Sequence, residues 1–184
     1  MKILLYCMVF ILGISVQSSA QEVLINGKPG QRLLVWSDFA GTPDETSQYF
    51  ANTYWNLNYK YSGVHTNADT VSLSGLELTL QFVADKSWLK EGKGTDDLLK
   101  HEQGHFDIGK LCQLEILAEV KKTVFYKDDF KSKLKTIFNS ALEKYKALGR
   151  KYDEETEHSI NKQKQEEWNG FILSENERLK KLNQ

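Results

Sequence analysis

Two histidines four positions apart, His101 and His105, flank Glu102 in the stretch DLLKHEQGHFDI (97–108). On an α-helix, residues four apart lie one turn apart on the same face, so both imidazoles can direct a ring nitrogen at one metal ion. Glu102 is rotated by about 100° from His101, beside the ion, where it can accept a proton from a water that the metal activates. The H-E-x-x-H spacing therefore predicts two zinc ligands and a general base.

The surrounding residues predict a helix from Thr95, a suitable N-cap, to about Val120. On this helix the face that carries His101 is otherwise apolar or small, with Leu98, Ile108, Gly109, Cys112 and Ile116. Two buried histidines without a partner are costly, and a metal ion removes that cost. The alternative is a pair of core histidines that bond to backbone carbonyls.

A catalytic zinc ion has three protein ligands and one open position, so a third ligand must come from another element. Glu119 follows on the same helix but lies about 21 Å beyond His105 at about 1.5 Å per residue. Two other histidines remain, His65 in a polar turn and His158 in the segment YDEETEHS. We favour His158 over His65 or a carboxylate, because an antiparallel return of the chain can bring it back to the motif.

The segment around His158 offers further polar groups. Tyr152 could donate a hydrogen bond to the oxyanion of a reacting amide, or it could be a packed aromatic residue at a helix end. Asp153, Glu155 and Thr156 could orient the His158 ring, or they could belong to a solvated acidic turn.

Strand patterns occupy the first half of the chain, at residues 32–36, 53–61 and 71–83. In the last of these the alternation changes phase at Ser74-Gly75, which predicts a bulge or a tight turn. The part at 76–83 directly precedes the motif helix, and an extended peptide could add to the edge of such a strand.

Helical spacing dominates the second half. We expect a second helix over 128–148, ended by Gly149, and a polar segment over 152–163 that begins as a loop. A last helix carries Trp168, Phe171, Ile172 and Leu179. The predicted fold is α+β, a small and mostly antiparallel sheet followed by three helices, the first of them a zincin-like active-site helix.

The first 20 residues have the pattern of a secretory signal peptide: Lys2, an apolar run, and small residues before a cleavage point after Ala20. The apolar run of about 14 residues is shorter than the roughly 20 needed to span a bilayer. We therefore expect a signal peptide at 1–20, a single metallopeptidase domain at 21–184 without a membrane span, and a secreted or periplasmic location.

The charge balance of the chain is close to neutral, with 24 basic and 25 acidic residues. Removal of the signal peptide removes only Lys2, which gives 23 − 25 = −2. Without a basic block, nucleic-acid binding has no electrostatic support. The predicted mature chain has one cysteine, Cys112, so no intrachain disulfide can form and stability must come from the core or from a metal.

Three motifs together resemble a bacterial family of predicted secreted zinc-dependent proteases, which is also catalogued as a domain of unknown function. The motif HEQGHFDI is similar to the central motif of that family. The stretch WSDFAGTP (36–43) resembles its W-x-D-F-x-G-x-P element, and YDEETEH (152–158), followed by Gln165 and Trp168, resembles its Y-D-x-x-T-x-H segment.

This resemblance implies a zincin-like metallopeptidase with His101 and His105 as ligands and Glu102 as base, and it supports His158 as well. Ser159 departs from the resemblance, which implies a glycine after that histidine.

Taken together, these features predict an exported zinc metallohydrolase, foremost a peptidase that acts on a peptide or protein substrate with Zn²⁺ as cofactor. One alternative is a non-catalytic, envelope-associated binding module with structural zinc or none, in which Trp55, Tyr59 and Tyr61 form a ligand face rather than part of the core. Another is a hydrolase of a different amide, such as a cell-wall bond.

Overall fold

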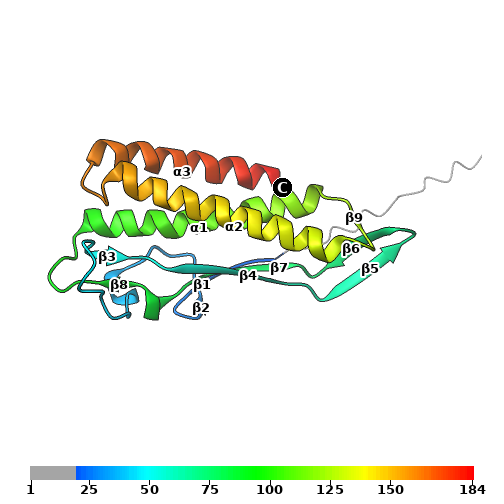
Figure 1. Cartoon of the computed structure of the whole chain (residues 1–184), viewed down its shortest axis with the longest axis horizontal. Helices are drawn as coiled ribbons and strands as arrows, with labels where there is room; N and C mark the ends of the chain where they lie inside the picture. The colour runs from blue at the N-terminus through cyan, green and yellow to red at the C-terminus, as the bar shows by residue number, and fades with distance from the viewer. Residues whose placement is uncertain (1–19) are drawn as a thin grey trace, which may run out of the picture.

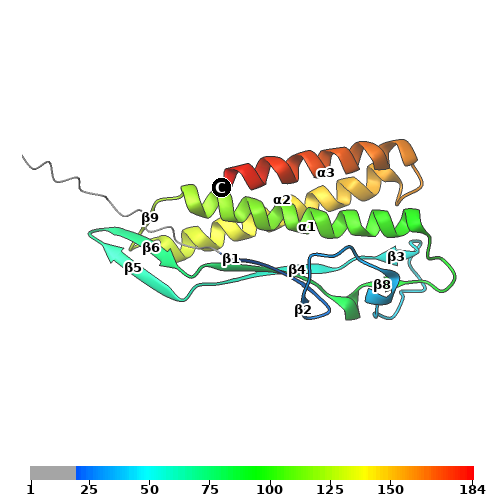
Figure 2. The ribbon, with the colours of Figure 1, turned by 180° about the vertical axis from the view of Figure 1, so that it is seen from behind.

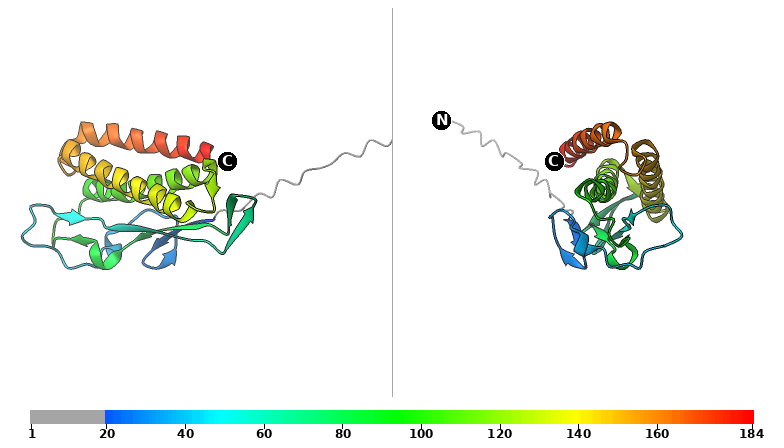
Figure 3. Two further views of the ribbon diagram at one scale, coloured as in Figure 1. Left: turned by 45° about the vertical axis from the view of Figure 1, so that its right-hand side comes forward. Right: turned by 90° about the vertical axis from the view of Figure 1, so that its left-hand side faces the viewer.

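A computed structural model describes residues 20–184 as a layer of β-strands beneath a layer of three helices (Figures 1 and 2). The end-on view in Figure 3 shows the two layers, and the α+β class is as predicted. The predicted signal peptide, residues 1–20, lies outside the described residues except for Ala20, which begins the first strand. None of the helices in residues 20–184 is both long enough and apolar enough to cross a membrane.

The main sheet has the strand order β2-β1-β7-β4. Its members are β1 (Ala20–Ile25), β2 (Lys28–Pro29), β4 (Trp55–Lys60) and β7 (Glu77–Phe82). Strand β7 pairs in parallel with β1 and antiparallel with β4. The expectation that residues 76–83 offer an edge to a peptide is therefore wrong, because β1 covers one side of β7 and β4 covers the other. Within the described residues, the unpaired edge on this side of the sheet belongs to β4.

Two smaller sheets complete the strand layer. They consist of β3 (Ala51–Asn52) with β8 (Trp88–Leu89), and of β5 (Gly63–Asn67), β6 (Thr70–Ser74) and β9 (Phe125–Tyr126). Two 3₁₀ turns, η1 (Trp36–Asp38) and η2 (Ala84–Lys86), lie between strands. The predicted break at Ser74-Gly75 is confirmed: it separates β6 from β7, and Gly75 has a φ of +58°.

The helices are α1 (Asp96–Lys122), α2 (Phe130–Thr156) and α3 (Lys162–Leu182). Helix α1 packs on β7 and β4 and also contacts both other helices, so it is the centre of the fold. The predicted cap of α1 is confirmed, because the Thr95 side chain accepts a hydrogen bond from the Leu98 amide at 3.2 Å. Leu80, Phe106, Leu111 and Cys112 are fully buried and belong to one core cluster.

Helix α2 does not end at Gly149, as predicted, but continues to Thr156. A Cβ at Gly149 would lie 3.7 Å from Nδ1 of His105, so this glycine lies where α2 passes close to α1. The helix ends instead at Glu157, whose left-handed φ of +49° breaks the pattern. Residues 152–156 are thus helical, not a loop, and their side chains have directions fixed by the helix.

The apolar stretch 32–36 is not the predicted strand. The Leu34 amide donates to Oε1 of Gln103 on α1 at 2.8 Å, and the Val35 amide donates to Oδ2 of Asp38 at 2.8 Å. Asp38 is buried and also accepts a hydrogen bond from Arg32 at 2.7 Å. Side chains therefore satisfy the backbone donors that a neighbouring strand would otherwise satisfy.

Gly41, in the stretch that resembles the early motif of the family, lies directly against the η2 segment. A Cβ added there would be 2.8 Å from the carbonyl oxygen of Asp85 and 2.9 Å from that of Ser87. Because both atoms belong to the backbone, neither can move away as a side chain could.

We predict that Gly41→Ala lowers the free energy of unfolding by about 1–3 kcal/mol, the usual cost of overpacking. Gly30→Ala is the matched control, since the nearest atom to its added Cβ is 3.8 Å away. Chemical denaturation of both variants measures the difference. Equal stability of the two variants would contradict the close approach at Gly41.

Candidate metal centre

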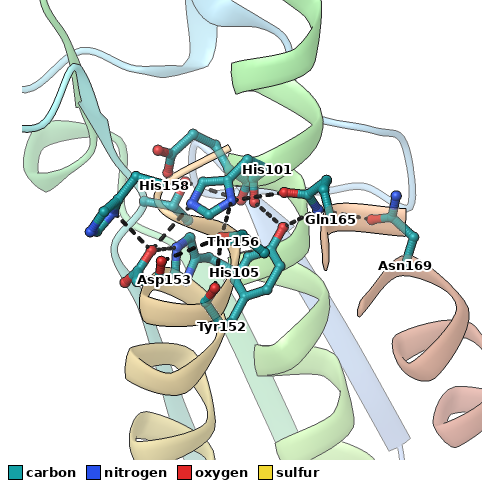
Figure 4. A network of polar contacts seen from close by, with 10 residues as sticks. His101, His105, Tyr152, Asp153, Thr156, His158, Gln165 and Asn169 are labelled. Carbon is teal, nitrogen blue, oxygen red and sulfur yellow. Dashed lines mark hydrogen bonds and ion pairs between the residues drawn. The ribbon is translucent and has the colours of Figure 1, made fainter. Parts of the chain in front are cut away.

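Three histidines converge on one carboxylate oxygen where α1 meets the end of α2 (Figure 4). Oδ1 of Asp153 lies 3.2 Å from Nε2 of His101, 2.8 Å from Nε2 of His105 and 3.2 Å from Nδ1 of His158. Two of these histidines come from adjacent turns of α1, and the third comes from the turn after α2. The predicted set of His101, His105 and His158 is thus brought together around a fourth residue.

This cluster could hold a metal ion. One ligand atom each of His101, Asp153 and His158 lie within 4.8 Å of one another. His105 borders this group through its contact with Asp153 but is not one of the three. Neutral imidazoles bring lone pairs and the carboxylate brings negative charge, so a divalent cation is the partner that this donor set fits.

Asp153 is the residue whose position the sequence did not predict. The sequence predicts it in a loop, either to orient His158 or as part of a solvated acidic turn, whereas it lies on the last turn of α2 and faces all three imidazoles. Burial opposes its charged form, but the neighbouring rings of His101 and His105 keep the pKa of the Asp153 carboxyl well below its usual range. Its place in the Y-D-x-x-T-x-H segment was the available signal.

The turn that presents His158 has an unusual backbone. Glu157, His158 and Ser159 have φ values of +49°, +51° and +79°. A left-handed conformation costs a non-glycine residue roughly 1–2 kcal/mol, which explains why a glycine suits the position of Ser159. The His158 amide donates to the Asp153 carbonyl at 3.1 Å, and the ring of Tyr49 lies over the imidazole at a centroid distance of 3.8 Å.

Tyr152 points toward α1 and packs against the rings of His101 and His105. Its hydroxyl donates to the His101 carbonyl at 3.1 Å and accepts from Nε2 of Gln165 at 2.6 Å. Its ring is stacked on the His101 ring, 4.6 Å between centroids, and burial raises the pKa of Tyr152 far above its usual value. This placement favours the packed aromatic residue over the predicted donor to a substrate oxyanion.

The glycine within the motif, Gly104, explains how Tyr152 comes so close. A Cβ at this position would lie 2.3 Å from the Tyr152 oxygen. Only a residue without a side chain allows α2 to lie against α1 at this level.

Glu102 is almost completely buried, and its Oε2 has no hydrogen-bond partner among the described residues. Burial raises the pKa of the Glu102 carboxyl, against the opposing effect of the nearby His105 and His101. An unpartnered buried carboxylate oxygen is costly, and such groups concentrate at functional sites.

The cluster of His101, His105, Asp153 and His158 opens onto a cleft of about 490 Å³ between β4 and α2. Glu102, His105, Asp153 and His158 all line it. Its other walls come from the 49–57 segment and from Leu142, Tyr145, Lys146, Gly149 and Arg150 of α2. Glu102 and three of the four cluster residues therefore face one accessible space.

Other candidate residues lie elsewhere. His65 is exposed on β5, at the opposite end of the molecule from the turn between α2 and α3 (Figure 1), and contacts Oγ of Ser74 at 3.0 Å. Glu155 accepts a hydrogen bond from the Trp168 indole at 2.8 Å, and Thr156 bonds to the Tyr152 carbonyl at 2.7 Å. The contact of Glu155 joins α2 to α3, and the contact of Thr156 lies within α2.

A family model described as "Bacterial protein of unknown function (DUF922)" matches residues 21–159. The chain belongs to this family. The match includes α1, α2 and all four residues of the histidine–aspartate cluster, and it ends before α3. Comparison with curated proteins and with solved structures gave no match.

We predict that Asp153→Ala weakens divalent metal binding. The loss should exceed about 10–100-fold, which is typical when a residue that only hydrogen-bonds to a ligand is removed. The expected cause is loss of a charged ligand at the centre of the cluster. Competition with a chromophoric chelator measures the change. Asp107→Ala is the matched control, because that carboxylate accepts from Gln103 and Lys110 on α1 instead. Equal affinity of the two variants would contradict the assignment of Asp153.

Proposed function

We propose that this protein is an exported zinc-dependent hydrolase that cleaves amide bonds, foremost those of peptides. The observation that carries the proposal is the position of Glu102. Its buried carboxylate has an unpartnered oxygen, and it lines the same cleft as His105, Asp153 and His158. A metal cluster and a potential proton acceptor thus share one accessible space.

Zinc is the ion that suits these ligands best. Zn²⁺ binds imidazole nitrogens and carboxylate oxygens in small, nearly tetrahedral sites. Ca²⁺ and Mg²⁺ prefer six or more oxygen ligands, which a cluster of three histidines and one aspartate does not supply.

When bound, zinc supplies a Lewis acid that polarises a carbonyl and lowers the pKa of a water. In this proposal Glu102 would accept the proton of the attacking water, which is supported by its position after His101 on α1 and by its place in the lining of the cleft. The same carboxyl can then pass that proton to the leaving amine. Asp153 and the three histidines would hold the ion during this transfer.

A peptide substrate is supported by the edge of β4. Trp55, Asn56 and Leu57 of this strand line the cleft, and the far edge of β4 pairs with no other strand in residues 20–184. An extended chain could add to that edge by backbone hydrogen bonds.

One observation favours the alternative of a binding module with structural zinc. Structural zinc sites are closed by four protein ligands, and four donor residues meet here. The suggested aromatic ligand face has less support, because Tyr59 and Tyr61 pack partly buried against the core. Glu102 distinguishes the two functions, since a structural site has no use for a buried base.

We predict that Glu102→Gln lowers the rate of peptide hydrolysis by at least about 10²–10⁴-fold, the usual contribution of a general base. Zinc content should stay the same, because the variant keeps every ligand. Digestion of a peptide library together with metal analysis measures both quantities. Glu119→Gln, at a partly exposed position further along α1, is the control and should retain activity.

A Glu102→Gln variant as active as the wild type would contradict the mechanism. The wild-type protein could bind stoichiometric zinc and cleave no peptide of the library, yet hydrolyse cell-wall amides. That result would assign cell-wall amides as the substrate. Zinc without any hydrolytic activity would favour the binding module.

A further inference from the structure

A buried chain of hydrogen bonds connects α3 to the ring of His101 (Figure 4). We infer that Gln165 is a positioning residue. It keeps the proton of His101 on Nδ1, so that Nε2 presents its lone pair to the metal centre. This inference rests on the metal-binding part of the proposed function and is independent of the hydrolysis. Gln165 lies in α3, beyond the residues that the family model matches.

The donor and acceptor roles in these hydrogen bonds follow from Tyr152. A phenol has one proton to donate, and the hydroxyl of Tyr152 lies 3.1 Å from the His101 carbonyl, which can only accept. The proton of Tyr152 is therefore used in this bond. The contact of 2.6 Å between the same hydroxyl and Gln165 must then run the other way, with the Gln165 amide nitrogen as donor.

The orientation of the Gln165 amide follows from this. Its Nε2 donates to Tyr152 and also to Oδ1 of Asn169 at 3.0 Å, so both of its protons are used. Its Oε1 faces Nδ1 of His101 at 3.0 Å. A carbonyl oxygen can only accept, so Nδ1 of His101 must carry a proton.

The neighbouring hydroxyl does not change this assignment. Oγ1 of Thr156 lies 3.4 Å from the same Nδ1, but it donates its own proton to the Tyr152 carbonyl at 2.7 Å. It can only act as a second, weaker acceptor for the His101 proton. Every group around Nδ1 therefore favours the N–H form at this nitrogen.

With the proton on Nδ1, a neutral His101 presents a lone pair at Nε2, the nitrogen that faces Asp153 at 3.2 Å. A lone pair directed at a carboxylate is unfavourable, whereas a cation shared by the two groups is favourable. The hydrogen bonds from α3 thus leave Nε2 of His101 free to bind a metal ion. Because His101, Tyr152 and Gln165 are 1%, 0% and 4% exposed, water cannot take the place of the glutamine.

The experiment compares Gln165→Leu, Gln165→Glu and Trp168→Phe with the wild type, with zinc alone as the probe. Leucine removes the acceptor for Nδ1, whereas glutamate keeps an acceptor there. Trp168→Phe, one turn further along α3, removes the 2.8 Å bond to Glu155 and tests for general loosening of the helix. Chelator competition gives zinc affinity. NMR of zinc-loaded protein labelled with ¹⁵N-histidine detects whether the Nδ1 proton of His101 is protected from exchange.

We expect Gln165→Leu to weaken zinc binding by about 10–100-fold, the usual effect of losing such a partner, and to lose the protected Nδ1 proton. Gln165→Glu should keep both the affinity and the proton signal, and Trp168→Phe should change neither. If Gln165→Leu does not fold, loss of the proton signal in Gln165→Glu would by itself overturn the inference.

Two further results would overturn it: unchanged zinc affinity in Gln165→Leu, or an equal loss in Trp168→Phe. A wild-type protein that binds no zinc would overturn the metal centre and this inference together. A zinc-binding protein that cleaves no amide, but whose affinity depends on Gln165 as described, would contradict only the hydrolase.

Discussion

The contact between the Asp153 carboxylate and three imidazoles is the interaction on which the rest of the site depends. One oxygen atom meets a nitrogen from each of His101, His105 and His158 at 2.8–3.2 Å. The four groups come from α1, from the last turn of α2 and from the turn that follows. A cation shared among them would join α1 to the end of α2, and His101 and Asp153 are 52 positions apart in the sequence.

The packing of the two helices makes this contact possible. Gly104 lets Tyr152 approach α1, and Gly149 removes a side chain beside His105. Gln103, between the motif histidines, instead faces the strand side, where its Oε1 accepts from the Leu34 amide. Within one turn of α1, successive residues thus serve the metal centre, the cleft, the loop below and the neighbouring helix.

Local signals in the sequence predicted the elements that depend on local interactions. The Thr95 cap, the alternation in β4 and the phase change before β7 all follow from side chains that act within a few residues. The Asn26-Gly27 turn between β1 and β2, with φ values of +54° and +70°, is a further local signal of a hairpin, which the predicted strands at 32–36, 53–61 and 71–83 do not include. The identity of the histidines that meet was also predictable, because their spacing and the late motif point to them.

The errors concern contacts between distant segments. Gly149 looks like a helix stop in the sequence, and only the approach of α1 shows that it serves packing. Because the sequence predicts a loop at the end of α2, it gives the Asp153 side chain no direction. The stretch 32–36 is apolar enough for a strand, yet Gln103 and Asp38 satisfy its amides. The position of β7 inside the sheet depends on its parallel pairing with β1, which no local pattern records.

The central claim is that one divalent cation binds to imidazoles and a carboxylate at the junction of α1 and α2. X-ray absorption at the zinc edge, on purified protein loaded with one equivalent of zinc, tests it most directly. The account predicts a first shell of nitrogen and oxygen at about 2.0–2.1 Å with the outer scattering of at least two imidazoles. A shell of water oxygens alone, or a sulfur at about 2.3 Å from the single cysteine of the described chain, would contradict it.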